Sequence, residues 1–280
     1  MREPFTFGIP LIARDAAVDW QRVDHLLALT LASVLAQLDG DYRVVLATHD
    51  VPPCWRVVAD DPRFEVVVAD WRAEPPSAAN DDGGRKKWLI KDRVRSNGGG
   101  LLMFLDADDW IDRTLVRTAR SAMRPSDIGA LVAHGMALDV ASLRAAPFPV
   151  AGAFDGPFHG LCGSSTIGRI DPGSDDPARL DPHLVLGSHH EWQQQAAQGG
   201  HGLAMLDCWG MYLVGTGESH SEHHGPFAAW RRDFSAAVRR HGAPLDAAIA
   251  RRFGIALGQL QGLDRPAARA SAAVPSKGKR

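Results

Sequence analysis

Short apolar runs alternate with helical patterns through the first half of the chain, and this alternation limits the folds that it can adopt. Four runs have the length and composition of buried strands: residues 5–12, 43–48, 64–69 and 101–105. Residues 20–38 place apolar side chains at helical spacing, and a basic helical pattern covers residues 85–96. Such alternation is typical of βαβ units. The sequence therefore predicts an α/β fold with a mostly parallel sheet flanked by helices.

The sequence of the second half of the chain predicts fewer helices and strands. We expect a helix over 113–123, a strand over 130–133, a helix over 191–198 and strands near 203–206 and 211–214. Residues 147–187 are rich in Pro, Gly, Ser and Asp and are interpreted as loops over an active face. Residues 230–260 follow a helical pattern interrupted at 241–244. The domain prediction is a catalytic domain over 1–225, a C-terminal helical extension over 226–263 and a disordered basic tail over 264–280.

Composition excludes several classes of protein. The chain has 280 residues and a formal net charge of −2, so no overall positive field would attract nucleic acid or an anionic membrane. Its three cysteines are widely spaced and form neither a disulfide framework nor a CxxC zinc site. The N-terminus lacks the pattern of a signal peptide, and no apolar segment approaches the ~20 residues of a membrane span. These features predict a cytoplasmic protein.

The strongest chemical signal follows the apolar run 101–105, which leads directly into Asp106, Asp108 and Asp109. In open α/β sheets, ligands bind beyond the carboxyl ends of the strands. Asp106 and Asp108 point the same way on an extended backbone, and two converging carboxylates repel each other unless a cation such as Mg²⁺ or Mn²⁺ joins them. The alternative is a solvated turn that caps the following helix.

Other polar residues are expected at the same edge of the sheet. Asp50 follows the second predicted strand and Asp70 follows the third. Lys87, Lys91 and Arg95 form one stripe of the basic helix just upstream of the aspartates, an arrangement that suits a diphosphate. A solvated helix face is the alternative for this stripe.

Histidines concentrate late in the chain, where seven of the twelve lie between His183 and His224. A histidine zinc site is the competing interpretation. No HExxH motif is present, because His190 and Glu191 are followed by Trp-Gln-Gln, which disfavours a metallopeptidase of that kind.

Several segments together resemble the GT-A-fold glycosyltransferases, in particular those of family 2. The segments are FTFGIPLIAR, LTLASVLAQ, RVVLATHD, GGGLLMFLDADDWI and GSHHEWQQQAAQGG, which occur in the family's order over residues 5–224. The resemblance implies a Rossmann-like nucleotide-diphospho-sugar transferase fold. It also implies that Asp106 and Asp108 hold Mn²⁺ or Mg²⁺ on the donor diphosphate, with His220 completing the metal site.

The same resemblance implies roles for two further acids. Asp50 would contact the nucleoside, and Glu191 would be the base that activates the acceptor. The sequence departs from the family pattern at both places: His190-Glu191 replaces the usual Glu-Asp pair, and Thr48-His49-Asp50 replaces Asp-Asp-Gly-Ser. Asp106, Asp70, Lys87 and Lys91 complete the predicted donor-binding set.

The leading hypothesis is therefore a metal-dependent glycosyltransferase. It would move a sugar from a nucleotide-diphosphate donor to a hydroxyl of a saccharide or other acceptor, with the inversion that the resemblance implies. The basic tail would provide at most weak contact with a membrane surface. One alternative is a haloacid-dehalogenase-like phosphatase, in which Asp106 would be the nucleophile and Asp108 the acid. Another is a non-catalytic nucleotide- or carbohydrate-binding protein.

Overall fold

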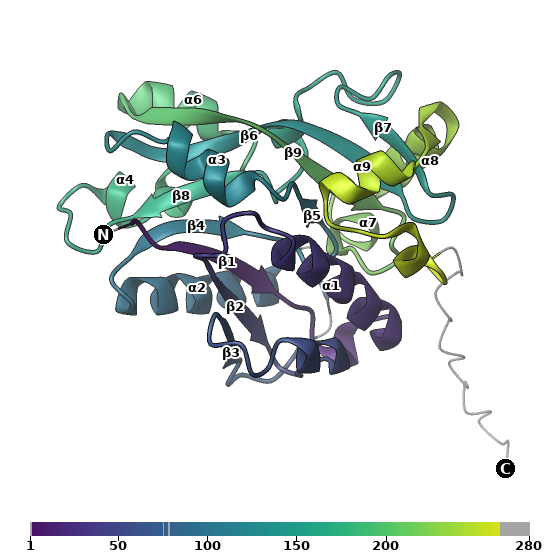
Figure 1. The fold of residues 1–280 in the computed structure, drawn as a ribbon, viewed down its shortest axis with the longest axis horizontal. Coiled ribbons are helices and arrows are strands. Elements are labelled where there is room, and N and C mark those ends of the chain that lie inside the picture. The colour runs from purple at the N-terminus through teal and green to yellow at the C-terminus, as the bar shows by residue number, and fades with distance from the viewer. Residues whose placement is uncertain (1, 75, 78, 264–280) are drawn as a thin grey trace, which may run out of the picture.

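A computed structural model describes residues 2–74, 76, 77 and 79–263 of the chain. These residues form a mixed α/β fold in which a curved ten-stranded sheet is flanked by helices (Figure 1). The order of the strands along the main path is β10-β7-β6-β8-β4-β1-β2-β3. Outside this path, β9 pairs with β6, and β5 pairs with β9. The α/β class that the sequence predicts is confirmed.

The N-terminal strands form the parallel part of the sheet, as the sequence predicts. They are β1 (Phe5–Pro10), β2 (Arg43–Thr48), β3 (Phe64–Val68) and β4 (Gly100–Phe104). The pairs β1–β2, β1–β4 and β2–β3 are all parallel. The carboxyl ends of these strands consequently lie along one edge of the sheet.

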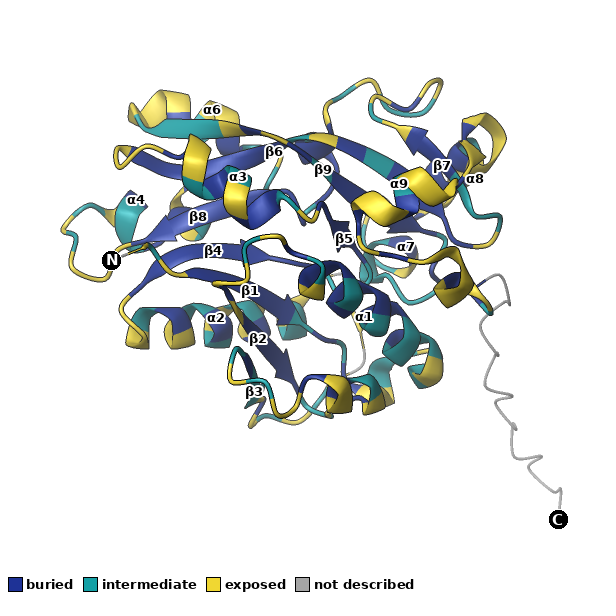
Figure 2. Cartoon of the chain, viewed as in Figure 1, coloured by how far each residue is buried: buried dark blue, intermediate teal, exposed yellow. Residues whose placement is uncertain are grey.

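Two long helices cover opposite faces of the parallel strands (Figure 1). Phe5, Phe7 and Ile9 of β1 pack in one core with the apolar side of α1 (Trp20–Leu35). Gly8, which points the other way, lies so close to Ile90 of α2 (Asp81–Ser96) that a Cβ would overlap it. Figure 2 shows buried residues along the strands and on the inner sides of the helices.

Antiparallel pairs and one parallel pair, β6–β9, build the remainder of the sheet. The strands are β5 (Trp110–Ile111), β6 (Asp127–Asp139), β7 (Arg144–Pro147), β8 (Thr166–Ile170), β9 (Gly202–Val214) and β10 (Ala243–Pro244). Strand β8 lies between β4 and β6 and pairs antiparallel with both, whereas β9 runs parallel to β6. The sheet is thus mixed, with its parallel half at the N-terminal end of the chain.

The interpretation of residues 147–187 as loops is wrong for β8, which is fully buried inside the sheet. Its sequence, TIGRI, is short and contains glycine and arginine, so it lacks the pattern of a central strand. Arg169 is tolerated there because its guanidinium pairs with Glu3 and donates to the backbone oxygens of Arg124 and Asp127.

Other predicted boundaries shift for local reasons. Helix α2 begins at Asp81 rather than at residue 85, because the Asn80 side chain accepts a hydrogen bond from Gly83 and caps the helix. The two predicted late strands are one strand, β9, whose pairing with β6 has register shifts. Gly135 of β6 and Gly210 of β9 leave the space that the Phe158 ring fills.

Shorter helices connect these strands. They are α3 (Leu115–Ala122), α4 (Pro177–Leu180), α5 (Pro182–Val185), α6 (Trp192–Gly199) and α7 (His220–His223). Single 3₁₀ turns are formed by η1 (Arg14–Ala16), η2 (Pro53–Val57) and η3 (Phe158–Gly160). The predicted helices at 113–123 and 191–198 correspond to α3 and α6.

The C-terminal segment packs on the core of the molecule. It contains α8 (Ala228–His241), α9 (Ala247–Arg252) and η4 (Leu257–Leu260), and β10 joins the edge strand β7. Phe234 and Val238 of α8 belong to the main core. Phe253, Ile255 and Leu260 form a second cluster with Leu26 and Leu29 of α1. The predicted tail, residues 264–280, lies outside the described residues.

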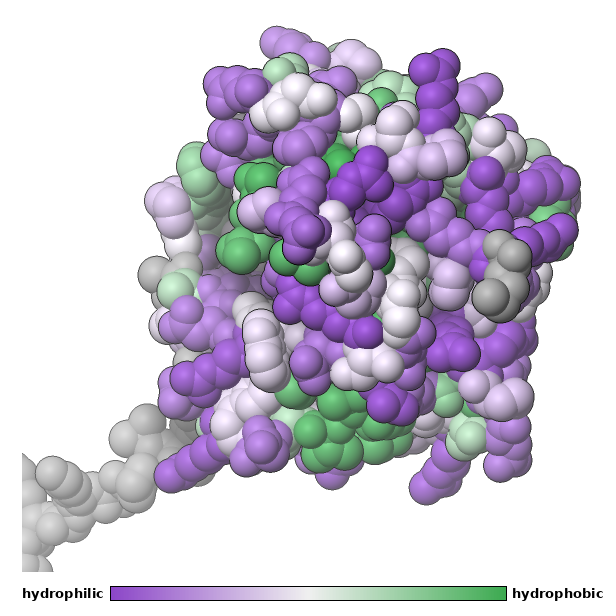
Figure 3. Space-filling model, turned by 90° about the vertical axis from the view of Figure 1, so that its left-hand side faces the viewer, coloured by the Kyte–Doolittle hydropathy of each residue, from purple (hydrophilic) through white to green (hydrophobic). Residues whose placement is uncertain are grey.

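The surface is mainly polar on the face that Figure 3 shows, with apolar side chains in a few small groups. Within the described part of the chain, no helix combines the length and the apolar character that crossing a membrane requires.

Candidate active site

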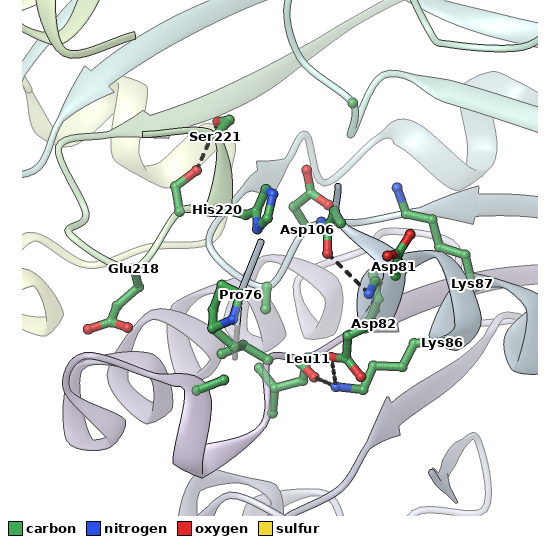
Figure 4. A pocket seen from close by; sticks show the side chains of 18 of the residues that line it. Leu11, Pro76, Asp81, Asp82, Lys86, Lys87, Asp106, Glu218, His220 and Ser221 are labelled. Carbon is green, nitrogen blue, oxygen red and sulfur yellow. Dashed lines mark hydrogen bonds and ion pairs between the residues drawn. The ribbon is translucent and has the colours of Figure 1, made fainter. Parts of the chain in front are cut away.

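A cavity of about 380 Å³ opens at the carboxyl end of β4 (Figure 4). Its walls include the end of β1, the segment between β3 and α2 with the first turns of α2, the turn after β4, and the segment 218–221 after β9. Further lining residues come from α1, the segment before β8, the turn before α6, β9 and α8. We call it the main cavity. Among the predicted site residues, Lys87, Asp106, Asp108 and His220 line it.

The turn after β4 divides its aspartates between the cavity and the core. Asp106 and Asp108 line the main cavity. The Asp106 N–H donates to the Ser164 hydroxyl at 2.9 Å. Asp109 is 1% exposed, and its carboxylate accepts hydrogen bonds from the Leu213 N–H at 3.1 Å and the Cys162 thiol at 3.3 Å. Asp109 therefore holds the turn against the core, and the other two carboxylates are available to a ligand.

Negative charge accumulates beside this turn. Burial, together with Asp109, Asp106 and Glu222, raises the pKa of Asp108 well above its usual range. Burial also raises the pKa of Glu222, although the N–H groups of Gly215 and Gly217 donate to its carboxylate. Clustered carboxylates with raised pKa values favour a cation beside them.

The donor set suits a metal ion that is shared with a substrate. Among the described residues, no group of three or more His, Cys, Asp and Glu side chains could hold a metal ion. This argues against the predicted alternative of a histidine zinc site in that part of the chain, and equally against a site in which Asp106, Asp108 and His220 together hold the ion. Mg²⁺ is usually held by one or two carboxylates together with waters and substrate phosphates. Asp106 and Asp108 fit this second arrangement, and His220 lines the same cavity.

The three cations of the predicted stripe on α2 do not all face the main cavity. Lys87 faces the main cavity, and its Nζ lies 5.5 Å from the centre of the Phe104 ring. Lys91 does not line that cavity, because its Nζ pairs with the Asp181 carboxylate at 2.6 Å. Arg95 reaches the same carboxylate at 3.3 Å. Of the three predicted cations, Lys87 alone lines the main cavity.

Lys86, which the sequence analysis did not select, forms part of the cavity floor. Its Nζ donates to the Leu11 carbonyl at 2.6 Å and to the Asp82 carboxylate at 2.5 Å (Figure 4). Burial lowers the pKa of Lys86, while Asp82 and Asp50 act in the opposite direction. The Trp71 indole N–H also donates to Asp82, at 3.0 Å. This network fixes the start of α2 against the end of β1.

Asp50, the predicted nucleoside contact, and Asp70, of the predicted donor-binding set, lie at the expected strand ends but do not line the main cavity. The Asp50 carboxylate accepts a hydrogen bond from the Arg14 N–H at 3.0 Å. Asp70 is exposed after β3. Both residues lie on the edge of the sheet at which the cavity opens.

Glu191 stands at the start of α6, and its carboxylate accepts a hydrogen bond from the Ser188 N–H at 2.8 Å. The structure does not place it among the residues that line the main cavity. His189, two residues earlier, does line it. Burial lowers the pKa of His189 to about 4, so its ring is neutral near neutral pH.

Sequence reasoning missed Arg231 and Tyr212, which both line the main cavity. Arg231 belongs to α8, and its Nη1 donates to the Tyr212 hydroxyl at 2.8 Å. Its guanidinium lies 5.6 Å from the centres of both the Tyr212 and Trp230 rings. No sequence signal distinguishes Arg231 from the other arginines of a polar helix. The C-terminal segment thus supplies a cation to the cavity that holds the aspartates.

No protein-family model matches the sequence, and no curated protein matches it. Solved structures show a partial likeness in fold. A protein from Desulfovibrio desulfuricans G20 described as a nucleotide-diphospho-sugar transferase is 9% identical, with 86% of this chain and 99% of that chain covered and a TM-score of 0.38. The inositol-1-phosphate CTP transferase from T. maritima is 11% identical, with 87% and 98% covered and a TM-score of 0.37.

The apo-form glycosyltransferase GlyE of Streptococcus pneumoniae TIGR4 is 10% identical, with 72% of this chain and 45% of that chain covered and a TM-score of 0.36. Identities and scores at this level describe the outline of a fold and carry no information on substrates. The function of this chain has to be inferred from its own residues.

Proposed function

We propose that the protein is a metal-dependent glycosyltransferase that uses a nucleotide-diphosphate sugar as donor. The observation that carries the proposal is that the carboxylates of Asp106 and Asp108 and the cations of Lys87 and Arg231 are among the charged groups that line one cavity at the carboxyl end of a buried strand. Carboxylates bind a divalent ion, and cations bind phosphate oxygens. A diphosphate with its metal ion requires both kinds of group.

Each residue has a distinct part in the proposed reaction. Asp106 and Asp108 hold Mg²⁺ or Mn²⁺, which when bound would neutralise charge on the diphosphate. Lys87 and Arg231 stabilise the negative charge that grows on the departing nucleoside diphosphate. His220, from the segment after β9, closes the same cavity beside the aspartates. The charge pattern would favour cleavage of the bond between the sugar and the diphosphate.

The acceptor hydroxyl needs a base, and Glu191 remains the proposed one. Its carboxylate would have to exchange the Ser188 N–H for the acceptor hydroxyl. Direct attack of that hydroxyl on the anomeric carbon inverts the configuration. Asp50 is the proposed contact of the nucleoside, because it follows β2 beside the buried Lys86.

Calorimetric titration of nucleoside diphosphates with and without Mn²⁺ tests the proposal. A panel of UDP, GDP, dTDP, CDP and ADP covers the unknown base. We expect at least one of them to bind in a metal-dependent manner, and Asp108→Asn to abolish that dependence. Asp207→Asn is the matched control, since it removes the same charge from a fully solvated side chain on β9.

The melting temperature of Asp108→Asn shows whether the variant folds. Because the Asp108 carboxylate is buried among like charges, its replacement by a neutral amide should leave the metal-free protein at least as stable. A folded Asp108→Asn protein with unchanged metal-dependent binding would contradict the site assignment.

The reaction products separate the proposed activity from its competitors. Sugar transfer releases a nucleoside diphosphate from the sugar nucleotide. Nucleotidyl transfer releases pyrophosphate from a nucleoside triphosphate, and a phosphatase releases inorganic phosphate from p-nitrophenyl phosphate. Pyrophosphate or phosphate as the metal-dependent product would overturn the proposal, and binding without any product would favour a non-catalytic binding protein.

A further inference from the structure

A second cavity, of about 230 Å³, adjoins the main cavity, and we call it the side chamber. Lys87, Gly163 and His189 line both cavities. Pockets for whole ligands usually measure roughly 300–1,000 Å³, so the side chamber suits one part of a substrate. Its remaining walls come from α2, the end of β4, β8, α5 and the turn before α6.

The wall of the side chamber contains a histidine, His183, whose ring nitrogens have no hydrogen-bond partner among the described residues. The His183 ring packs edge-on against Phe104, with ring centres 4.7 Å apart, and against Trp192, with ring centres 5.2 Å apart. Both ring nitrogens are buried, and neither has a hydrogen-bond partner among the described residues. Buried polar atoms in native proteins are normally hydrogen-bonded, and these two nitrogens can therefore bond to a ligand or to water.

The His183 ring is neutral near neutral pH, because burial lowers its pKa to about 3. A neutral imidazole offers one donor and one acceptor, which together match a hydroxyl group. Thr166 and Ser188 bring two further hydroxyl-bearing side chains to the same chamber. The uncharged part of this wall is therefore suited to a hydroxylated compound.

The chamber also has an excess of positive charge. Lys91 and Arg95 share the single carboxylate of Asp181, at 2.6 and 3.3 Å. Lys87 has no carboxylate within ion-pair distance in the part of the chain that the structure describes. A charge left unpaired in a concave site attracts an anionic ligand.

We propose that the side chamber binds an anionic, hydroxyl-bearing part of the substrate, namely a polyol or sugar that carries a phosphate monoester or a carboxylate. Lys87 and Lys91 would bind the anionic group, and His183 would bind a hydroxyl. The inference rests on the proposed function, because it assigns the non-nucleotide part of the substrate to a place beside the diphosphate. It also narrows the proposed substrates to charged ones.

The NMR signals of the His183 and His189 ring nitrogens allow a direct test of binding in the side chamber. In protein labelled with ¹⁵N-histidine, the His183 signals are assigned by their loss in His183→Phe. Glycerol 1-phosphate and glucuronate are the anionic probes, and glycerol and glucose are their neutral counterparts. We expect both His183 and His189 signals to move with at least one anionic probe, and at least tenfold weaker responses with the neutral compounds.

Two charge variants locate the binding. Lys87→Ala should weaken the response to the anionic probe by at least tenfold. Arg93→Ala is the matched control, because it removes a positive charge from the same helix at a residue that pairs with Glu65 and lines neither cavity. Equal effects of the two variants, or equal responses to charged and neutral probes, would overturn the proposal.

A competition experiment separates the side chamber from the main cavity. The titration is repeated with a saturating nucleoside diphosphate from the panel and Mn²⁺. Simultaneous binding of nucleotide and probe supports two subsites, and the better probe distinguishes a phosphate from a carboxylate substrate. Mutual exclusion would mean that the probe occupies the diphosphate site, which would overturn the proposal. If no nucleotide binds but the probe still moves His183, the proposed function fails and the chamber assignment stands.

Discussion

Acidification should destabilise the protein through the buried His183. Burial lowers the pKa of His183 to about 3 in the folded state, whereas an unfolded chain has the ordinary histidine pKa of about 6.5. Between these values the unfolded chain binds a proton that the folded protein does not. The stability that the neutral ring contributes is therefore complete above about pH 6.5 and is lost as the pH falls toward about 3.

The size of the effect follows from the proton linkage. One additional proton on the unfolded chain changes the free energy of unfolding by about 1.4 kcal/mol per pH unit. From about pH 7.5 to about pH 5.5, His183 should cost about 1.4 kcal/mol of stability in total, since over these two pH units the unfolded chain carries on average about half a proton on this ring. Further acidification to about pH 4.5 should cost about as much again.

Urea unfolding of the wild-type protein and of His183→Phe, followed by tryptophan fluorescence, measures this contribution. The difference in unfolding free energy between the two proteins should change by about 1.4 kcal/mol over that range, with the wild type losing more. His241→Phe is the control, because it makes the same substitution at an exposed histidine. A constant difference between the wild type and His183→Phe would refute the argument from burial.

Three further predictions concern the site and the C-terminal segment. Glu191→Gln should lower transfer by about 10²–10⁴-fold in kcat with donor affinity unchanged, and preserved kcat with weaker donor binding would make Glu191 a binding residue. Arg231→Met should lower kcat by roughly 10²–10³-fold in steady-state assays, whereas a loss of stability alone would assign Arg231 a structural role. A chain that ends at Pro226 should aggregate on expression, whereas one that ends at Leu263 should keep the wild-type melting temperature, because Phe253 and the other apolar residues of the second cluster are then present. A folded, active chain ending at Pro226 would contradict this last prediction.

The parallel half of the fold could be predicted from the sequence because its signals are local. Strand β4 is an uninterrupted apolar run, β2 is apolar except at its two end residues, and α1 has one apolar side. Strand β8 could not be predicted, because its burial depends on neighbours that are distant in the sequence. Arg169 is acceptable in the sheet only when Glu3 lies beside it, and residue spacing does not reveal that pairing.

In the candidate site too, residues with a local sequence signal could be predicted, and residues that only distant packing brings to the cavity could not. Asp106 and Asp108 could be selected because an apolar strand leads directly into them, although β4 ends at Phe104 and both residues lie in the turn that follows. The separation of Lys87 from Lys91 could not be predicted, since it depends on Asp181, far along the chain. Arg231 carries no local signal either, because only the packing of α8 brings it to the cavity.

The attachment of the C-terminal segment has a consequence for how the molecule is synthesised. The ring of His25 in α1 bonds to the backbone oxygen of Gln259, and β10 joins the sheet beside β7. Contacts between residues so distant in sequence are slow to form and wait for the later partner. During translation, the cluster around Leu26 and Leu29 therefore stays incomplete until residues near 260 leave the ribosome. A nascent chain should expose part of this apolar surface, and be prone to aggregation, until that point.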